Sequence, residues 1–315
     1  MASFVEEIVE FIKVQYLVAT LVGILIFVPL ERLFPLWPKQ RIIRTGWGTD
    51  LAHFLLDRFM VGFLLAMGIS GCQLVIQETL LWLASIGVNH FGKALFHIQK
   101  TVQSLPFLGQ LFVMVFVGDF AFYWIHRLFH RVPFLWKFHA VHHSIEEMDW
   151  LAHGRFHPIE TVIIMTVATV ATRLSGVNAY LGYWYVAVNY LDWVLHSNVR
   201  FHSRLLSFFI ATPEFHHWHH SSDPKQHNKN FSVRFPILDL VFGTFYLPKT
   251  GENPFPAQYG ISDDVPLNYL KHLAYPFWPF WWKQKPEPVE GIPLDGFPAS
   301  DSENNNGIEP TPTEP

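Results

Sequence analysis

The chain has almost no cysteine. Cys72 is the single one among 315 residues, so no internal disulfide can form and a thiolate-rich zinc or iron–sulfur site is excluded. If the protein binds a transition metal, histidine must therefore supply the ligands.

Charged residues are also scarce, at 15% of the chain, and neither sign dominates. The sequence has 22 Lys and Arg against 26 Asp and Glu, which gives no electrostatic basis for binding nucleic acid. It has no glycine-rich phosphate loop, no dinucleotide fingerprint and no CxxCH haem-attachment motif. An oxidoreductase with this sequence would take its electrons from a separate reductase or carrier protein.

Hydrophobic residues make up half of the chain, more than a soluble domain usually carries. Five apolar stretches, at residues 16–30, 51–83, 105–125, 161–174 and 180–195, predict about four to five membrane-spanning helices. The last two stretches are short and are expected to form a hairpin. The first is interpreted as a retained anchor, because Glu6, Glu7 and Glu10 stand where a signal peptide would carry basic residues.

The loop after the first stretch carries Arg32, Lys39, Arg41 and Arg44, so the positive-inside bias places it in the cytoplasm. Counting the spans from this loop puts every histidine cluster on the cytoplasmic side. The predicted fold class is all-α: an integral membrane domain, residues 1–283, with a cytosolic helical cap rich in histidine. Its catalytic region is expected at about residues 115–248. Residues 284–315, rich in proline and acidic residues, predict a disordered tail.

Eighteen histidines are the unusual feature of the composition. Three clusters share a helical spacing of three or four residues, which places imidazoles on one face of a helix. The clusters are HRLFH with His126 and His130, HAVHH with His139, His142 and His143, and HHWHH with His216, His219 and His220 as its inward set. Three such clusters beside apolar spans indicate a metal site rather than scattered surface histidines.

Two further histidines extend the set: His157 in HPIE and His196 in DWVLHSN. Together with the clusters they supply most of the ligands that two octahedral metal ions need, and neutral imidazole suits iron. Asp119, Glu160 and Asp192 lie one or two helical turns from predicted ligands. We expect them to accept the distal imidazole N–H, with an ordinary ion pair or helix-terminal charge as the alternative for each.

The remaining histidines fall outside this pattern. We expect the following to lie at the surface or the membrane interface: His53, His90, His97, His202 and His272. Three more lie close to the clusters but are not expected to bind metal: His153, His217 and His227.

These motifs resemble those of the fatty acid hydroxylase and sterol desaturase superfamily. The matching segments follow in order along residues 31–248: ERLFPL, GWGTDLAHF, DFAFYWIHRLFH, HAVHHS, RFHPIE, HSN, TPEFHHWHHSSD, NKNFS and FPILDLVFGTFYLP. The resemblance implies two iron ions, O₂ as co-substrate, and hydroxylation or desaturation of a membrane lipid such as a sterol, a fatty acyl chain or a carotenoid. The iron ligands that it implies are His126, His130, His139, His142, His143, His157, His196, His216, His219 and His220.

Two other classes of protein stay open at this point. A membrane zinc-dependent hydrolase would also use imidazole ligands, and a non-enzymatic haem or electron-transfer protein would use paired axial histidines. A lipid substrate is expected to enter laterally from the bilayer, because a long apolar chain gains nothing by crossing water. Four tryptophans are candidates for lining its route, with interfacial anchoring as the alternative: Trp124, Trp136, Trp184 and Trp193.

Overall fold

The computed structural model describes residues 14, 17–178, 180–279 and 282–283. Within these residues the chain is helical, and two isolated β-bridges join Pro35 to Val199 and Ser221 to Tyr259. The prediction of an all-helical fold is thus confirmed for the described part of the chain. The predicted tail, residues 284–315, lies outside it.

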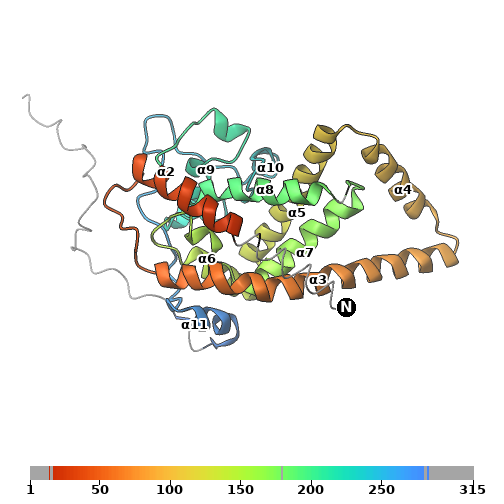
Figure 1. Ribbon diagram of the computed structural model, residues 1–315, viewed down its shortest axis with the longest axis horizontal. Coiled ribbons are helices and arrows are strands. Elements are labelled where there is room, and N and C mark those ends of the chain that lie inside the picture. Colours follow the sequence, from red (N-terminus) through yellow and green to blue (C-terminus); the bar gives the residue numbers. More distant parts are fainter. Residues whose placement is uncertain (1–13, 15–16, 179, 280–281, 284–315) are drawn as a thin grey trace, which may run out of the picture. The chain divides into compact units, whose positions relative to one another are not determined.

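Five longer helices form the main body. They are α3 (Trp47–Ser85), α4 (His90–Gln103), α5 (Phe107–Arg131), α7 (Pro158–Leu174) and α8 (Leu181–Leu191). Helix α7 packs against both α3 and α5, and α8 packs against α5. Figure 1 shows these helices extending from a region in which the shorter elements gather.

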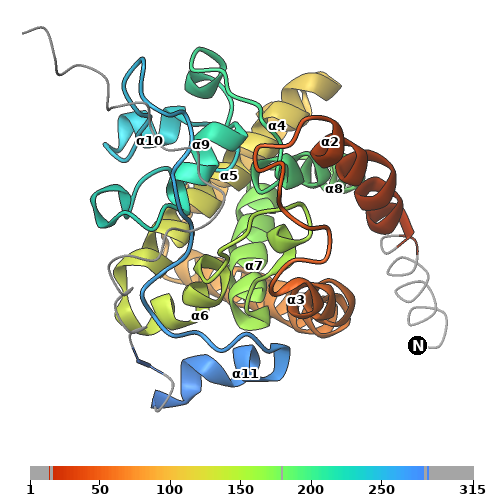
Figure 2. The same ribbon diagram turned by 90° about the vertical axis from the view of Figure 1, so that its left-hand side faces the viewer.

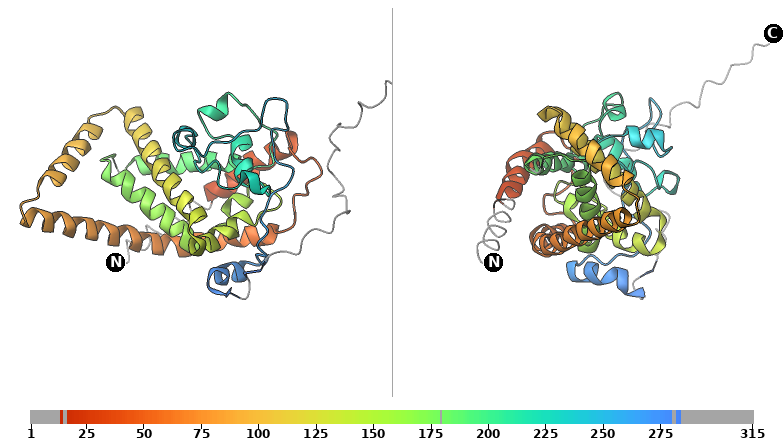
Figure 3. Two further views of the ribbon diagram at one scale, coloured as in Figure 1. Left: turned by 180° about the vertical axis from the view of Figure 1, so that it is seen from behind. Right: turned by 90° about the vertical axis from the view of Figure 1, so that its right-hand side faces the viewer.

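The shorter elements carry most of the predicted metal ligands. They are η1 (Gly23–Phe27), α2 (Val28–Leu33), α6 (Pro133–His143), η2 (Ala152–Gly154), η3 (Asp192–Leu195), η4 (Leu206–Phe208), α9 (Pro213–His219), η5 (Pro224–Gln226), α10 (Ile237–Val241), α11 (Tyr269–Ala274) and η6 (Tyr275–Phe277). The view in Figure 2 looks onto this end, where α6, α9 and the start of α3, seen end-on, face the viewer. Helix α11 packs against α3, as the views in Figure 3 also show.

Two described helices are long and apolar enough to cross a membrane: Met60–Ser85, which is the second part of α3, and α5. Only 6% of the residues in the most apolar window of α3 are buried, so its apolar side chains face outward, as lipid-facing side chains do. Helices α7 and α8 have 17 and 11 residues. At 1.5 Å per residue they are about 25 Å and 17 Å long, shorter than the ~30 Å hydrocarbon core. Four to five spans therefore stays a prediction.

Proline sets the boundaries of the helices that carry the histidines. Pro133 occupies the first turn of α6, where its missing N–H costs nothing, and it separates α6 from α5. Pro158 and Pro213 begin α7 and α9 in the same way. The N-cap of α9 is Thr212, whose hydroxyl accepts from the N–H of Phe215 at 3.3 Å. The first and second histidine clusters thus lie on two separate helices joined by a tight turn.

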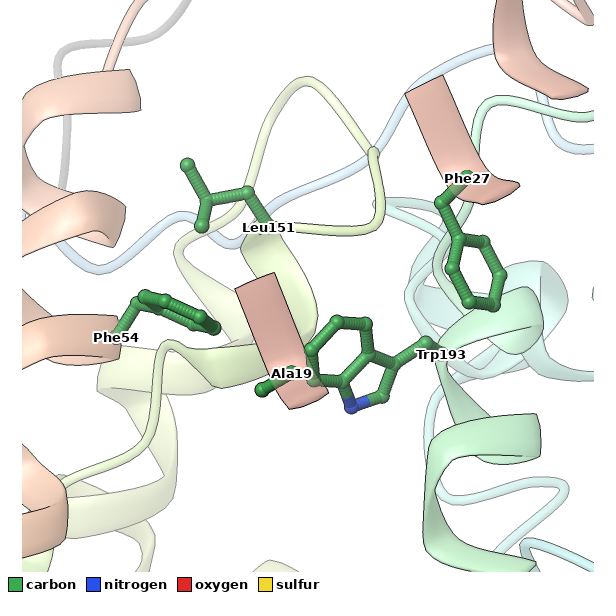
Figure 4. Close-up of a cluster of buried hydrophobic side chains, with 5 residues drawn as sticks. All are labelled: Ala19, Phe27, Phe54, Leu151 and Trp193. Atoms are coloured by element: carbon green, nitrogen blue, oxygen red, sulfur yellow. The ribbon is translucent and has the colours of Figure 1, made fainter. Parts of the chain in front are cut away.

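A hydrophobic cluster ties the amino-terminal helix to the rest of the domain. It consists of Ala19, Phe27, Phe54, Leu151 and Trp193, which come from four separate segments (Figure 4). Next to it, Gly23 lies so close to the Trp150 ring that a Cβ atom at this position would be 2.4 Å from the indole. Glycine is therefore required for the helix to approach this closely.

A buried network of four charges fixes the start of α3 against the loop before α7. The Arg155 guanidinium donates to both carboxylate oxygens of Asp50. Arg44 donates to Asp50 at 2.6 Å and to both oxygens of Asp149, at 2.6 and 2.8 Å. Burial opposes the charge of Asp50, but the two guanidinium groups outweigh it and hold the pKa of this carboxyl below its usual value. The network matters for the site because the carbonyl of Arg155 bonds one of the clustered histidines.

We predict that Asp50→Asn destabilises the fold by roughly 3 kcal/mol, because it leaves Arg155 and Arg44 with an uncompensated buried charge. Since the pKa of Asp50 is depressed in the folded state, its contribution is present at neutral pH and is lost as the pH falls below the usual aspartate range. Denaturation of the detergent-solubilised protein measures the effect. Glu252→Gln, at an exposed position outside both candidate spans, serves as control, and equal stability of the two variants would contradict the prediction.

Candidate metal centre

The structure brings nine of the ten predicted ligands together in two adjacent groups: the eight histidines of the three clusters and His196. In each group, one possible ligand atom from every residue lies within 4.8 Å of all the others. The first group is His126, His130, His139, His143 and His219. The second group is His142, His196, His216 and His220.

Helix geometry explains how neighbouring residues come to serve different groups. Successive residues on an α-helix point about 100° apart, whereas residues at i and i+4 share a face. On α6, His139 and His143 therefore reach the first group and His142 reaches the second. At the end of α9, His219 enters the first group and His220 the second.

Hydrogen bonds to acceptors fix which nitrogen of each first-group imidazole carries the proton. His126 donates from Nδ1 to the carbonyl of Phe231 at 2.7 Å. His219 donates from Nδ1 to the carbonyl of Lys229, also at 2.7 Å. Because a carbonyl can only accept, both imidazoles expose an Nε2 without a proton. The buried Nε2 of His219 has no hydrogen-bond partner among the described residues.

For His139, a carboxylate fixes which nitrogen carries the proton. The Nδ1 of His139 lies 2.5 Å from Oε1 of Glu160, so Nδ1–H donates to the carboxylate and Nε2 carries the lone pair. This Nε2 lies only 3.0 Å from the bare Nε2 of His126. Two lone pairs at this distance repel each other unless a cation lies between them.

The second group has the same construction. His142 donates from Nδ1 to the carbonyl of Arg155 at 3.1 Å, which leaves its Nε2 bare. The Nε2 of His196 lies 3.2 Å from the Nε2 of each of the other three members: His142, His216 and His220. The Nδ1 of His196 lies 3.1 Å from Nδ1 of His153, which can accept a hydrogen bond from the Nδ1–H of His196.

These distances match the donor set of an octahedral metal ion. An imidazole nitrogen binds such an ion at about 2.1 Å, so two nitrogens at right angles around one ion are about 3.0 Å apart. The observed separations of facing nitrogens are 3.0 to 3.2 Å in both groups. The residues present therefore fit one metal ion in each group.

Burial keeps the imidazoles neutral, the form in which they bind metal. Burial lowers the pKa of His219 to about 4. Burial, followed by the positive charge that neighbouring imidazoles would carry, lowers the pKa of six others well below the usual histidine value: His139, His142, His143, His196, His216 and His220. No proton has to leave these nitrogens before a metal ion binds at neutral pH.

The structure places His157 outside both groups, contrary to the expectation that it is a ligand. Its Nδ1 accepts from the backbone N–H of Ile159 at 3.2 Å and so caps the start of α7. Its Nε2 donates to the carbonyl of Leu273, also at 3.2 Å. With both nitrogens engaged by backbone groups, His157 orients α7 and anchors the segment after α11.

The three predicted carboxylates have different partners from those expected. Glu160 bonds His139 and not His157, as described above. Asp119 accepts the backbone N–H groups of Val233, Arg234 and Phe235. Asp192 pairs with the Arg234 side chain. No described hydrogen bond joins either aspartate to an imidazole, and both bond the segment after the third cluster; for Asp192 the structure thus shows the ion pair that was the alternative.

Sequence reasoning also missed several buried contacts. His153, which it set aside, supports His196. His53 and His272, expected at the surface, are buried and bonded to each other at 2.9 Å, and Asp57 accepts from His53 at 2.7 Å. The spacing of His53 and Asp57 at i and i+4 was an available signal, whereas the carbonyl acceptors of the ligands leave no trace in the sequence.

His217 and His227 belong to neither group, and that they do not bind metal stays a prediction. The Nδ1 of His217 lies 2.8 Å from the Tyr259 hydroxyl, and burial lowers the pKa of His217 to about 3. His217 thus has a packing role on the far side of its cluster.

A cavity of about 490 Å³ lies against the second group. His142, His196 and His216 form part of its wall, and most of the rest is apolar, including Leu65 and Ile164. Of the four tryptophans considered for the substrate route, Trp193 lines this cavity. The exposed Trp124 and Trp184 are consistent with interfacial anchors, and Trp136 packs against the first group.

The fold and the site together define a helical, membrane-associated type of protein with a histidine-rich metal centre beside an apolar cavity. The fatty acid hydroxylase profile matches residues 111–244, which contain all nine histidines of the two groups. An ornithine lipid hydroxylase, OlsE, from Rhizobium tropici is 30% identical over 249 residues, covering 78% of this chain and 71% of its own length. The chain belongs to the fatty acid hydroxylase family, which confirms the resemblance found in the sequence.

Two other relatives are less similar and match a smaller part of the chain. Human alkylglycerol monooxygenase is 26% identical over 172 residues, which are 53% of this chain and 37% of the relative. A very-long-chain aldehyde decarbonylase, GL1-6, from Oryza sativa subsp. indica is 26% identical over 142 residues, 40% of this chain and 21% of the relative. The chain thus spans less than half the length of these two. No solved structure matches.

We predict that Glu160→Gln lowers the affinity for metal about 10- to 100-fold, because a neutral amide no longer fixes the tautomer of His139. Titration of the metal-free protein against a competing chelator measures this affinity. The exposed Glu146→Gln is the control. Unchanged affinity in Glu160→Gln would show that the carboxylate does not act through His139.

His157→Asn is expected to keep the full metal content of the wild type, since asparagine can still cap α7 and His157 lies in neither group. His157→Ala should lose about 1 kcal/mol of stability through the lost cap but no metal. Metal analysis of both purified variants tests this, and a drop in metal content in His157→Asn would restore His157 as a ligand.

Proposed function

We propose that this protein is a di-iron oxygenase that hydroxylates or desaturates a membrane lipid with O₂. One observation carries the proposal: two groups of neutral imidazoles turn bare nitrogens toward common points beside an apolar cavity. The similarity to an ornithine lipid hydroxylase and to an alkylglycerol monooxygenase supports the choice of reaction.

In this proposal nine histidines bind iron, five in the first group and four in the second. Bound iron would supply the site where O₂ binds and the electrons needed to oxidise an unactivated C–H bond. The chain's own residues do the positioning: Glu160 holds His139, His153 holds His196, and the carbonyl of Arg155 holds His142. Ligands carried on helices α5, α6 and α9 are held more rigidly than ligands on loops would be.

The cavity is where the lipid would lie. Its apolar lining excludes water and accepts a hydrocarbon chain, while three second-group imidazoles form one of its walls. A lipid held there would present its C–H bonds to the second group. Because OlsE matches 78% of this chain, a lipid with an ornithine headgroup is the first substrate that we would test.

We also propose that the domain has four to five spans and that the metal centre lies on the cytoplasmic side. Lys39 and Arg41 are exposed in the loop before α3, and Arg32 is exposed in the last turn of α2, as the positive-inside rule expects of a cytoplasmic segment. The same loop contacts the histidine end, since the backbone N–H of Trp37 donates to Asn198 at 2.8 Å, two residues after His196. Loop and metal centre therefore share one side. A separate protein must then supply the electrons from the cytoplasm.

The alternatives fit the site less well. A zinc hydrolase needs about three ligands and a water molecule, which leaves most of the nine imidazoles without a purpose. A haem needs a flat slot between two axial ligands, whereas here four or five nitrogens converge within 4.8 Å.

Single substitutions in each group test the proposal. We expect His219→Ala, in the first group, and His142→Ala, in the second, each to lose iron and to abolish the oxidised lipid. Iron is measured after anaerobic purification, and lipid products by mass spectrometry of a host that lacks its own activity. The exposed His97→Ala is the control. Full iron binding in both variants would refute the ligand assignment, and zinc with no oxidised product in the wild type would refute the oxygenase.

A further inference from the structure

The two groups of imidazoles face in different directions. His142, His196 and His216 of the second group line the cavity, whereas His126 is the member of the first group that does so. The substrate side of the centre is therefore the second group. The first group must have another neighbour, and its nature bears on how electrons arrive.

That neighbour is Trp136 on α6. Its ring centroid lies 5.3 Å from that of His130 and 5.5 Å from that of His143, so the indole is in contact with both imidazoles. The spacing in the sequence explains the contact with His143, because positions 136, 139 and 143 are at i, i+3 and i+7 and share one face of α6. Trp136 does not line the cavity.

The outer edge of Trp136 leads to the protein surface. The indole N–H donates to Oδ2 of Asp263 at 3.2 Å, and the Lys137 ammonium lies 3.0 Å from the same oxygen. The side chains of Lys137 and Asp263 are 18% and 13% exposed. Beside them, the exposed Trp282 ring lies 5.4 Å from the Lys137 ammonium. Only one half-buried aromatic side chain thus separates the first group from a partly buried ion pair, whose Asp263 lies between the exposed residues Ser262 and Asp264.

We propose that Trp136 is the side chain through which electrons enter the metal centre, a role that rests on the proposed di-iron function. A reduced one-electron carrier protein of the iron–sulfur or cytochrome class would dock over Lys137 and Asp263. Each transfer oxidises the carrier by one electron and reduces one ferric ion to ferrous, and the indole gains no lasting charge. Trp136 acts through His130 and His143 and does not touch the substrate.

The side from which electrons enter follows from the residues that surround the two groups. On the cavity side the lining is mostly apolar, which suits a lipid chain better than the polar surface of a water-soluble carrier. On the Trp136 side the indole connects to a surface with charges of both signs, which suits the polar rim of a transient protein complex. Electrons and substrate would then reach the centre from opposite sides without competing for space.

A purely structural role is the competing explanation, since Trp136 also packs against a cluster that contains Ala140, Val141, Val265 and Tyr275. The two roles differ in what a substitution changes. Loss of packing would reduce stability and iron content, whereas loss of the electron route would slow reduction while the iron stays bound.

Light-triggered reduction tests the route without knowledge of the natural carrier. In a Cys72→Ser background, a ruthenium photoreductant is attached to Ser262→Cys, an exposed position next to Asp263. Flash photolysis then measures the rate at which the oxidised iron-loaded protein is reduced, and metal analysis measures iron per chain. The variants are Trp136→Leu, which removes the ring, and Trp136→Phe, which keeps an aromatic ring. Trp218→Phe is the matched control, because Trp218 lies within the third cluster but packs on Tyr246.

We expect Trp136→Leu to slow reduction by about tenfold at unchanged iron content, Trp136→Phe to slow it less, and Trp218→Phe to leave it unchanged. Equal rates in Trp136→Leu and the wild type would overturn the proposal. So would loss of iron in both Trp136 variants, which would mark a packing role. A wild-type protein that binds no iron would instead refute the proposed function, so the two failures are distinguishable.

Discussion

Unprotonated imidazole nitrogens face one another at the centre of this protein, and most of its other features follow from that constraint. His126 and His139 meet at 3.0 Å, and His196 meets three other imidazoles at 3.2 Å. Without a cation this arrangement is repulsive, and buried nitrogens without partners cost folding free energy. With a metal ion in each group, each of these nitrogens would bind the ion. The ions would then link α5, α6, α9 and the end of η3.

Hydrogen bonds from the second ring nitrogen of several ligands fix the orientation of these imidazoles. Backbone carbonyls of Phe231, Lys229 and Arg155 each accept from the rear nitrogen of one ligand, and Glu160 does so for another. The carbonyl of Arg155 is in turn fixed by the buried ion pairs of its own side chain with Asp50. The supporting contacts therefore extend from the metal centre to the start of α3, which makes metal binding and folding interdependent.

Much of the site could be predicted from the sequence because helical spacing is a local property. The separation of His126 from His130 by one turn dictates that both face the same way, and the structure agrees. The errors concern contacts between distant segments. Asp119 and Asp192 were assigned to nearby histidines, but their partners lie at residues 233–235, more than 40 residues away. For His157 a local signal was overlooked: Pro158 marks the first turn of α7, so His157 stands at the capping position.

The most direct test of the centre is a structure of the purified protein with diffraction data collected at the iron absorption edge. We predict two anomalous peaks, one bonded to the Nε2 atoms of His139 and His219 and the other to those of His196 and His220. A single peak, a zinc signal in place of iron, or imidazoles of the two groups turned away from a common centre would contradict this arrangement.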